Sequence, residues 1–412
     1  MGVSISYMGT KRRLASVVSD IVRRLPHGPL LDAFSGMCAV GQNIGPLRQV
    51  WTNDIQLFPA IVGKALFCSK REPMSSENVK QILERPFRRN LKALEERFTT
   101  YLKKEENYLV TRKLKDVIAG NTELPYVGND SKLEQERKRL ARKPNTFPYR
   151  LATITYVGSF FGVKQSMELD SLRYAIDTAK ANRSIDAQQR DWLIIALGKV
   201  LSRINNSTGQ FAQYIKPKAN NIDTIINKRR RSAWSEFFSS VDSISPIGAP
   251  DWRSRNRAFQ TDAVVLLSQI RNYEDKPTIV YADPPYSEAQ YSRYYHVLDT
   301  LVEYRYPPAT GAGRYPDKRY QASFSHSAAV LNSMKKLVGR VSKLGACLVL
   351  SYPENGLFCQ KGGNIIDLLK FFYLHVTVAH SETQDHSTFG GGEAPPKVST
   401  IENIYIASHQ KY

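Results

Sequence analysis

Hydrophobic and polar positions alternate with helix spacing and with strand spacing in the N-terminal part of the chain. Apolar positions at helix spacing predict a helix over residues 11–25, and short apolar runs predict buried strands at residues 30–33 and 50–55. A loop of small residues and a helical segment separate the two predicted strands. This order, with the second strand ending in an acid, is typical of a doubly wound α/β sheet.

The same α/β pattern returns towards the C-terminus. Strands are predicted over residues 278–283, 345–353 and 399–408. Residues 256–267 predict a strand followed by a helix, and residues 364–380 predict a helix followed by a strand. Residues 70–254 between the two parts are polar, charged and mostly helical in periodicity. We therefore predict a catalytic α/β domain formed by residues 1–69 and 255–412, which is interrupted by a mostly helical insertion.

Composition fits a globular chain, since 42% of its residues are hydrophobic and 23% are charged. The length of 412 residues suggests two domains. The chain lacks an apolar run of roughly 18 residues, so we expect no membrane span. Its first residues lack the apolar core of a signal peptide. The four cysteines have neither paired nor metal-ligand spacing, so we expect free thiols, no metal site and a cytoplasmic location.

Net charge points to a polyanionic partner. The chain has 58 Lys and Arg against 38 Asp and Glu, a net charge of +20, and a surplus of this size favours nucleic acid. The basic run at residues 137–143 is better explained as the exposed face of a helix. Elsewhere in the insertion we select Lys, Arg and Gln residues as candidate DNA contacts. They are Lys164, Gln165, Arg173, Gln210, Lys216, Lys218, Arg229, Arg230 and Arg231.

The sequence Asp-Pro-Pro-Tyr at residues 283–286 follows an apolar strand. The two prolines end the strand because they cannot donate to the sheet, and Asp283 is held extended before them. Ligands of open α/β sheets bind at this carboxyl end of the strands. A rigid turn with a satisfied aspartate is the alternative for the first three residues alone, but the whole segment favours a functional turn.

This turn resembles the catalytic motif of methyltransferases that act on exocyclic amines of nucleobases. The order of motifs resembles the Dam-like alpha group of adenine-specific DNA methyltransferases: residues 7–14 are similar to its N-terminal motif, 30–41 to its cofactor loop and 52–55 to its acidic strand end. Cys38 stands where that loop usually has its second glycine. The resemblance implies a Rossmann-like sheet that binds S-adenosylmethionine (SAM), with an inserted target-recognition domain.

The resemblance also implies roles for individual residues. The implied cofactor contacts are Tyr7, Gly9, Lys11, Asp32, Phe34, Gly36, Asp54, Asp262 and Asp283, and the implied catalytic residues are Asp283, Pro284, Pro285 and Tyr286. Asp54 would hold ribose hydroxyls, with a helix cap as the alternative, and Asp262 is as well explained by a helix cap. The Asp283 carboxylate and Pro284 carbonyl would accept the amine hydrogens while Tyr286 stacks on a flipped base.

The predicted function is methylation of N6 of a flipped-out adenine at a specific site in double-stranded DNA. The resemblance implies that this activity belongs to a restriction-modification or defence system. We expect the enzyme to be associated with the nucleoid and to have a restriction or defence-system protein as a possible partner. Cytosine-N4 methylation in DNA and adenine-N6 methylation in RNA use the same chemistry and stay open. A non-catalytic DNA-binding subunit that retains the fold is the alternative from another class.

Overall fold

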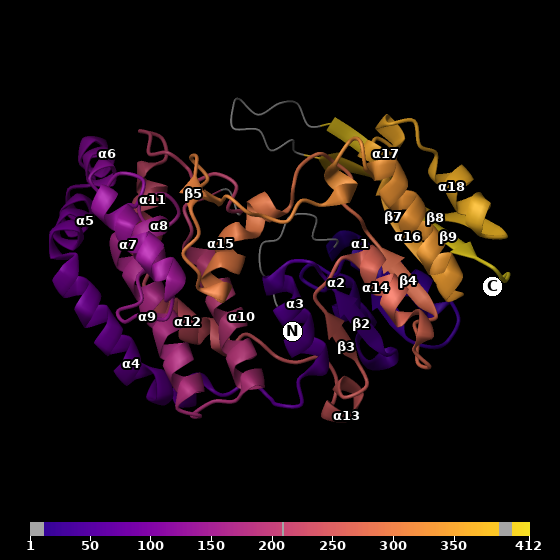
Figure 1. Ribbon diagram of the computed structural model, residues 1–412, viewed down its shortest axis with the longest axis horizontal. Helices are drawn as coiled ribbons and strands as arrows, with labels where there is room; N and C mark the ends of the chain where they lie inside the picture. The colour runs from indigo at the N-terminus through magenta and orange to yellow at the C-terminus, as the bar shows by residue number, and fades with distance from the viewer. Residues whose placement is uncertain (1–11, 208–209, 387–397) are drawn as a thin grey trace. The chain divides into compact units, whose positions relative to one another are not determined.

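The computed structural model describes residues 12–207, 210–386 and 398–412 (Figure 1). The chain forms two compact units, which we describe separately. Among the described residues, we call 12–70, Pro246–Ser292 and Tyr320–Tyr412 the α/β unit, and Arg71–Ser245 and Arg293–Arg319 the helical unit. Within the described ranges, no helix is both long and apolar enough to cross a membrane.

The α/β unit contains a seven-stranded sheet in the order β3-β2-β1-β4-β7-β9-β8. The strands are β1 Leu30–Asp32, β2 Val50–Asn53, β3 Arg257–Phe259, β4 Ile279–Ala282, β7 Cys347–Pro353, β8 His375–His386 and β9 Val398–Ser408. The helices are α1 Arg12–Arg23, α2 Ala39–Ile44, α3 Leu57–Cys68, α13 Pro250–Arg253, α14 Ala263–Gln269, α16 Val330–Leu344, α17 Leu357–Gln360 and α18 Ile365–Phe372. These elements confirm the strands predicted from the apolar runs.

The first five strands of the sheet are parallel, and β9 runs antiparallel to both β7 and β8. Leu31 of β1 lies between Trp51 of β2 and Val280 of β4. Strand order reverses between β1 and β4, which makes their carboxyl ends the switch point where such sheets bind ligands. Every residue of β1, β2, β4 and β7 is buried, because helices cover both faces of a parallel sheet.

Helices pack closely on this sheet. Leu266 of α14 and Leu337 of α16 join Leu31 and Val280 in one apolar core, and Figure 1 shows these two helices together over the sheet. On α3, a Cβ added to Gly63 would lie 2.4 Å from the Thr52 hydroxyl oxygen of β2. The close approach of α3 to β2 therefore requires glycine at this position. This packing fixes the end of β2, which Asp54 directly follows.

The helical unit contains ten helices and a short hairpin among its described residues. They are α4 Ser76–Arg97, α5 Thr99–Thr111, α6 Leu114–Thr122, α7 Ser131–Arg142, α8 Leu151–Thr155, α9 Val163–Ala181, α10 Ala187–Ile204, α11 Ile222–Arg229, α12 Ala233–Val241, α15 Ser292–Glu303, β5 Ala309–Thr310 and β6 Tyr315–Pro316. Helix α9 is the buried centre, and α4, α8, α10 and α12 pack around it.

Buried acids on α9 cap its neighbours. Asp170 accepts hydrogen bonds from the backbone N–H groups of Ala152 and Thr153 (both 2.8 Å), at the N-terminus of α8, and from the Tyr304 hydroxyl (2.6 Å). Burial raises the pKa of Asp170 to about 6, although these hydrogen bonds lower it. The orphan donors at a helix start need acceptors, and Asp170 of α9 supplies them for two of these groups in α8.

The helical unit includes Arg293–Arg319, a segment that we expected in the C-terminal catalytic part. Its side chains explain this placement. His296 of α15 is buried and bonds through Nε2 to the Phe211 carbonyl (3.1 Å), and Tyr304 bonds to Asp170. Because these partners all lie in the helical unit, α15 packs with the insertion.

Candidate active site

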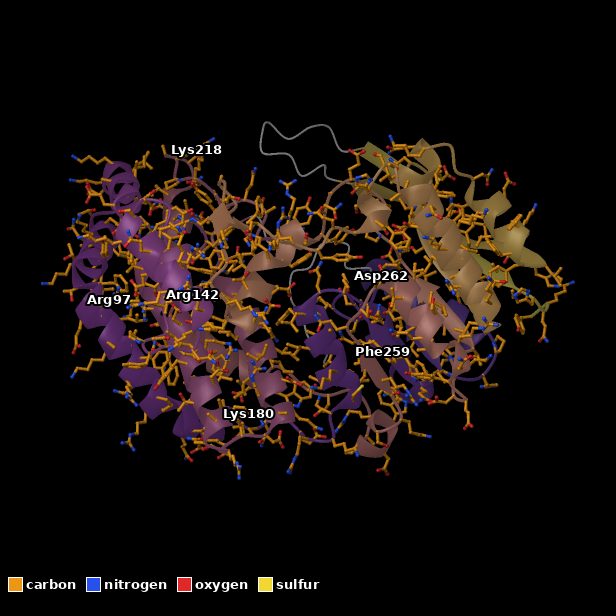
Figure 2. The ribbon with its side chains drawn as sticks, viewed as in Figure 1. Arg97, Arg142, Lys180, Lys218, Phe259 and Asp262 are labelled. Carbon is orange, nitrogen blue, oxygen red and sulfur yellow. The ribbon has the colours of Figure 1, made fainter. Side chains whose placement is uncertain are left out.

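Carboxylates follow four neighbouring strands of the α/β unit. Asp32 ends β1, Asp54 comes directly after β2, Asp283 comes directly after β4, and Asp262 follows β3 by three residues. Figure 2 labels Asp262 beyond Phe259, the last residue of β3. Because the strands are parallel, the fold brings these four predicted cofactor residues to one edge of the sheet.

Asp32 is the most deeply buried of these acids. Its side chain is 2% exposed, and within the described part of the chain its Oδ1 has no hydrogen-bond partner. Burial, together with the charges of Asp283 and Asp54, raises the pKa of Asp32 to about 8, against a smaller lowering by the Phe34 N–H. A positively charged ligand at this edge would relieve that repulsion.

Asp54 organises the loop that follows β1. Its Oδ2 accepts from the N–H of Gly36 (3.0 Å) and its Oδ1 from the N–H of Gln56 (2.9 Å). Gly36 has φ +47°, a conformation that glycine adopts without steric cost. Burial raises the pKa of Asp54 to about 6. Each carboxylate oxygen retains a lone pair, so Asp54 can also accept from ligand hydroxyls.

Cys38 shows how the loop accommodates its departure from the usual glycine. It is fully buried and has φ 59° and ψ 33°, in the left-handed region. A side chain in that region costs about 1–2 kcal/mol. Its Sγ lies 3.8 Å from the Gly36 carbonyl, and burial raises the pKa of this thiol. The loop therefore retains the backbone turn that a glycine would adopt, with a neutral thiol inside it.

Asn53, which the sequence analysis missed, ties three loops together. Its Nδ2 donates to the carbonyls of Ala33 (3.0 Å) and Thr261 (3.1 Å), and its Oδ1 accepts from the N–H of Thr261 (3.3 Å). The loops after β1, β2 and β3 are thus held by one buried amide. Its position directly before Asp54 was the available clue, because polar residues at a buried strand end are unusual.

Asp262 caps a helix, which was one of the two alternatives from the sequence. Its Oδ1 accepts from the N–H groups of Val264 (2.9 Å) and Val265 (3.1 Å) at the start of α14. Its Oδ2 accepts from the hydroxyl of Tyr320 (3.0 Å), a residue that the sequence analysis did not select. The cap interpretation is confirmed, and it fixes the Asp262 carboxylate at the edge of the site.

The Asp-Pro-Pro-Tyr turn is anchored on two sides. Tyr286 packs partly buried against the core, and its carbonyl accepts from the N–H of Leu357 (2.7 Å). Further along, Gln290 accepts through Oε1 from the N–H of Ala322 (2.8 Å). Nothing in the sequence singled out Gln290, since its partner is remote along the chain. These contacts hold Asp283, which is half-buried, on a fixed backbone.

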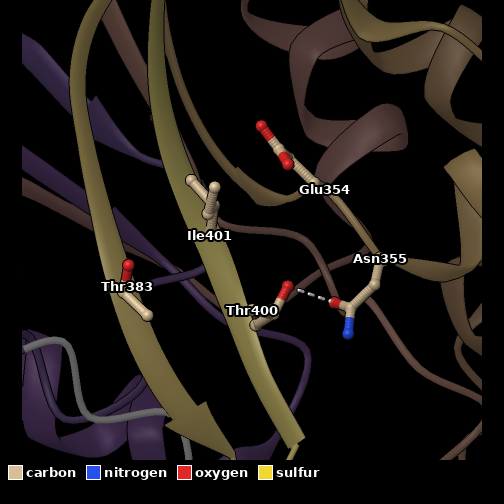
Figure 3. Close-up of a pocket in the computed structure, with 5 residues that line it drawn as sticks. All are labelled: Glu354, Asn355, Thr383, Thr400 and Ile401. Carbon is tan, nitrogen blue, oxygen red and sulfur yellow. Dashed lines mark hydrogen bonds between the residues drawn. The ribbon is translucent and has the colours of Figure 1, made fainter.

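A polar pocket of about 380 Å³ lies at the end of β7, a strand that is parallel to β4. Figure 3 shows its lining residues. It is lined by Glu354, Asn355, Thr383, Thr400 and Ile401. The Thr400 hydroxyl donates to Asn355 Oδ1 (2.7 Å), which links β9 to the loop after β7. The pocket therefore presents amide and hydroxyl groups beside the end of β7.

Three of the predicted DNA contacts require correction. Gln165, Arg173 and Arg229 are buried in the helical unit, and each donates to main-chain carbonyls there. They satisfy backbone groups inside the unit, which makes them structural residues. The other candidates lie at its surface: Lys164, Lys216, Lys218, Arg230 and Arg231 are exposed, and Gln210 is half-exposed. The predicted cofactor contacts Tyr7, Gly9 and Lys11 lie outside the described residues.

Comparison with known proteins gives a family match and several relatives. Residues 252–345 match the family of D12 class N6 adenine-specific DNA methyltransferases. The chain is 21% identical over 370 residues to modification methylase StsI of Streptococcus sanguinis, covering 89% of this chain and 46% of that protein. It is 20% identical over 389 residues to modification methylase LlaI of Lactococcus lactis subsp. lactis, covering 93% and 51%.

A third relative, the type II methyltransferase M.FokI of Planomicrobium okeanokoites, is 21% identical over 359 residues, which cover 86% of this chain and 45% of that protein. The chain thus spans about half the length of the curated relatives that it matches. The family match includes β3, β4 and the Asp-Pro-Pro-Tyr turn, which are the elements that carry Asp262 and Asp283.

Proposed function

We propose that this chain is a SAM-dependent methyltransferase of the Dam-like alpha group that methylates N6 of adenine at a specific site in double-stranded DNA. One observation carries the proposal. Asp283 stands on a rigid turn at the switch-point edge of the sheet, within the segment that matches the adenine-specific family. The names of the three relatives support a restriction-modification setting.

The acids at the sheet edge fit the proposed cofactor. Asp32 offers a buried carboxylate oxygen that lacks a partner in the described chain, and Asp54 offers further acceptor capacity beside it. SAM would supply a positive charge for the first, ribose hydroxyls for the second, and a methyl group activated by its sulfonium. Phe34, packed edge-on against Phe324 with ring centroids 5.4 Å apart, adds an apolar wall beside these acids.

The turn at residues 283–286 fits a nucleobase amine. The amine is a poor nucleophile because its lone pair is delocalised into the ring. The Asp283 carboxylate and the Pro284 carbonyl would accept its two hydrogens and favour the attacking geometry, and the rigid backbone keeps both acceptors in place. Tyr286 would stack on the base. The amine cannot reach this edge from inside a duplex, so the adenine must flip out.

The helical unit would bind the DNA around the target. Its exposed cations Lys164, Lys216, Lys218, Arg230 and Arg231 would contact phosphates, and Gln210 would reach base edges. This role makes the helical unit the target-recognition domain. A companion restriction or defence protein would complete the system, as restriction-modification requires a nuclease with the same specificity.

The deciding experiment is methyl transfer from labelled SAM to unmethylated genomic DNA, with mass spectrometry of the nucleosides. We expect N6-methyladenine. N4-methylcytosine would preserve the mechanism but change the substrate, and label in RNA alone would exclude the DNA proposal.

Asp283→Ala tests the catalytic turn. It should lower the rate of transfer by at least about 10²–10³-fold, which is typical when one aligned electrostatic group is lost. SAM binding should stay largely intact, because Asp32 and Asp54 would still hold the cofactor. Asp251→Ala removes an exposed carboxylate of the same unit as the control. Equal rates for the Asp283 and Asp251 variants would refute the assigned role.

A further inference from the structure

The helical unit contains a cavity of about 640 Å³ that neither the proposed chemistry nor the family match explains. It is lined by Asn121, Tyr126, Asn129, Ser159, Tyr214, Gly311, Ala312 and Arg314. These residues come from the end of α6, the loops around α7, α8 and α11, and the turn between β5 and β6. Figure 1 shows α6, α8, α11 and β5 towards one end of the helical unit. Pockets of this size hold ligands as large as a nucleotide.

Arg314 places a fixed positive charge in the wall of this cavity. It is 8% exposed, and its Nη1 donates to the carbonyls of Thr155 and Val157 (2.7 Å to the latter). Its guanidinium lies 3.7 Å from the centre of the Tyr126 ring. Burial lowers the pKa of Arg314 to about 10, so it remains charged at neutral pH.

The partners of Arg314 are all neutral. Its contacts in the described chain are carbonyls and tyrosines, and no described carboxylate forms an ion pair with it. A buried charge without a counter-ion costs several kcal/mol. An anion in the cavity would recover part of this cost, and the phosphate of a nucleotide is the anion that a DNA-binding unit meets.

The amides around the cavity are suited to reading a base. Asn121 Oδ1 accepts from Arg229 Nη1 (3.0 Å), which fixes the amide orientation and leaves its NH₂ group as the remaining donor. Asn129 is exposed, and its backbone N–H donates to the Tyr126 carbonyl (3.0 Å). Asparagine amides recognise base edges, adenine in particular. Buried Arg229, which we had expected at a phosphate, thus orients a lining residue of the cavity.

Aromatic and basic groups complete the surroundings. Tyr214 is half-buried, with its ring edge-on to Phe160 at 6.2 Å, and a tyrosine in such a wall is a stacking platform for a base. Lys216 and Lys218 follow Tyr214 along an irregular segment and are exposed. Figure 2 shows Lys218 at the upper edge of the helical unit. These lysines would hold the DNA backbone near the cavity.

We propose that this cavity binds one nucleotide of the DNA other than the target adenine. Arg314 would face its phosphate, Asn121 and Asn129 would contact its base edge, and Tyr214 would stack on its ring. The inference rests on the proposed function and names the residues that read part of the recognition sequence.

Two isosteric substitutions test it. Asn121→Asp and Asn129→Asp each introduce a negative charge at the cavity without changing its volume, and the first preserves the acceptor for Arg229. Asn182→Asp is the control, because its carboxylate preserves the acceptor for the Ser184 N–H. Asn182 lies just after the end of the 19-residue helix α9, about 28 Å from the start of that helix. The start of α9 follows the lining residue Ser159, so Asn182 is remote from the cavity.

Binding of the full chain to a labelled duplex that contains the methylated site, measured by fluorescence anisotropy, gives the readout. We expect both cavity variants to bind at least about tenfold more weakly, within the range for loss of one base contact, while SAM affinity is unchanged and the control stays within about twofold. Asn129→Ala, which adds no charge, should relax the preference for one base when methylated sites are mapped by sequencing.

Equal DNA affinity in the cavity variants and the control would overturn this inference, and methylation by the wild type would then leave the proposed function standing. A wild-type chain that binds no DNA would overturn both. If Asn121→Asp fails to fold, the exposed Asn129 decides the outcome alone.

Discussion

Replacing Asp32 by asparagine gives a test that needs neither substrate nor cofactor. The substitution preserves the shape of the side chain and an acceptor for the Phe34 N–H, but it removes the ionisable group. Asp32 is buried beside Asp54 and Asp283, so ionisation places a third charge among them. We expect the asparagine variant to be more stable than the wild type, by a margin that grows with pH.

The magnitude follows from proton linkage. The pKa of Asp32 is about 8 in the folded chain, whereas an unfolded aspartate has a pKa of about 3.9. Between these values the folded wild type holds one proton that the unfolded chain lacks, so its free energy of unfolding falls by about 1.4 kcal/mol per pH unit. The stabilisation is complete below about pH 4 and is lost as pH rises through the folded value. Asparagine removes this slope, which gives a relative gain of about 2.8 kcal/mol between pH 5 and 7.

Urea unfolding of both proteins at pH 5, 6 and 7, without cofactor, measures this difference. Asp54 is present in both proteins, so the comparison isolates Asp32. Asp251→Asn, at an exposed position of the same unit, is the charge-matched control. Parallel pH dependences for the wild type and the Asp32 variant would refute the reasoning, because they would mean that Asp32 titrates in the folded chain as it does in the unfolded one.

Two further predictions concern the helical unit. Asp170→Ala leaves two backbone N–H groups and the Tyr304 hydroxyl without their acceptor. The free energy of unfolding, measured by urea titration, should therefore fall by about 3–5 kcal/mol, and an unchanged midpoint would contradict the capping role. Replacing Lys216 and Lys218 by glutamine should reduce the slope of log affinity for DNA against log salt by about 2, since each phosphate contact contributes about 0.9. Lys180→Gln is the control, because Figure 2 shows Lys180 and Lys218 at opposite ends of the unit, and an equal reduction by the control would mean that neither lysine site is specific.

The sheet and its acids could be predicted because their signals are local. An apolar run followed by a carboxylate marks a strand end whether or not its neighbours are known, and Asp32, Asp54 and Asp283 all follow this pattern. The parallel pairing then brings these strand ends to one edge.

The errors arose where the partner is remote in sequence. Arg229 looks like an exposed cation within a basic run, but its partner carbonyl at Gly158 is 71 residues away. Arg314, which the sequence analysis did not select, likewise bonds to Thr155 across 159 residues. Periodicity shows which face of a helix is apolar, but not which charged group will satisfy a distant carbonyl. Asn53 and Gln290 were missed for the same reason. Their side chains form hydrogen bonds between loops that are remote in sequence and adjacent only in the fold.

If the helical unit selects the target site, as proposed above, its division into two segments has a consequence for exchanging specificity between related enzymes. Transplanting Arg71–Ser245 alone would leave behind Tyr304, which holds Asp170, and Arg314, which forms a wall of the cavity. A functional graft must therefore carry Arg293–Arg319 as well, so a single crossover between two genes cannot deliver an intact new specificity. On the proposed role, enzymes with this arrangement would diversify their specificity mainly by point substitution around the cavity, while Arg293–Arg319 is inherited together with the catalytic turn.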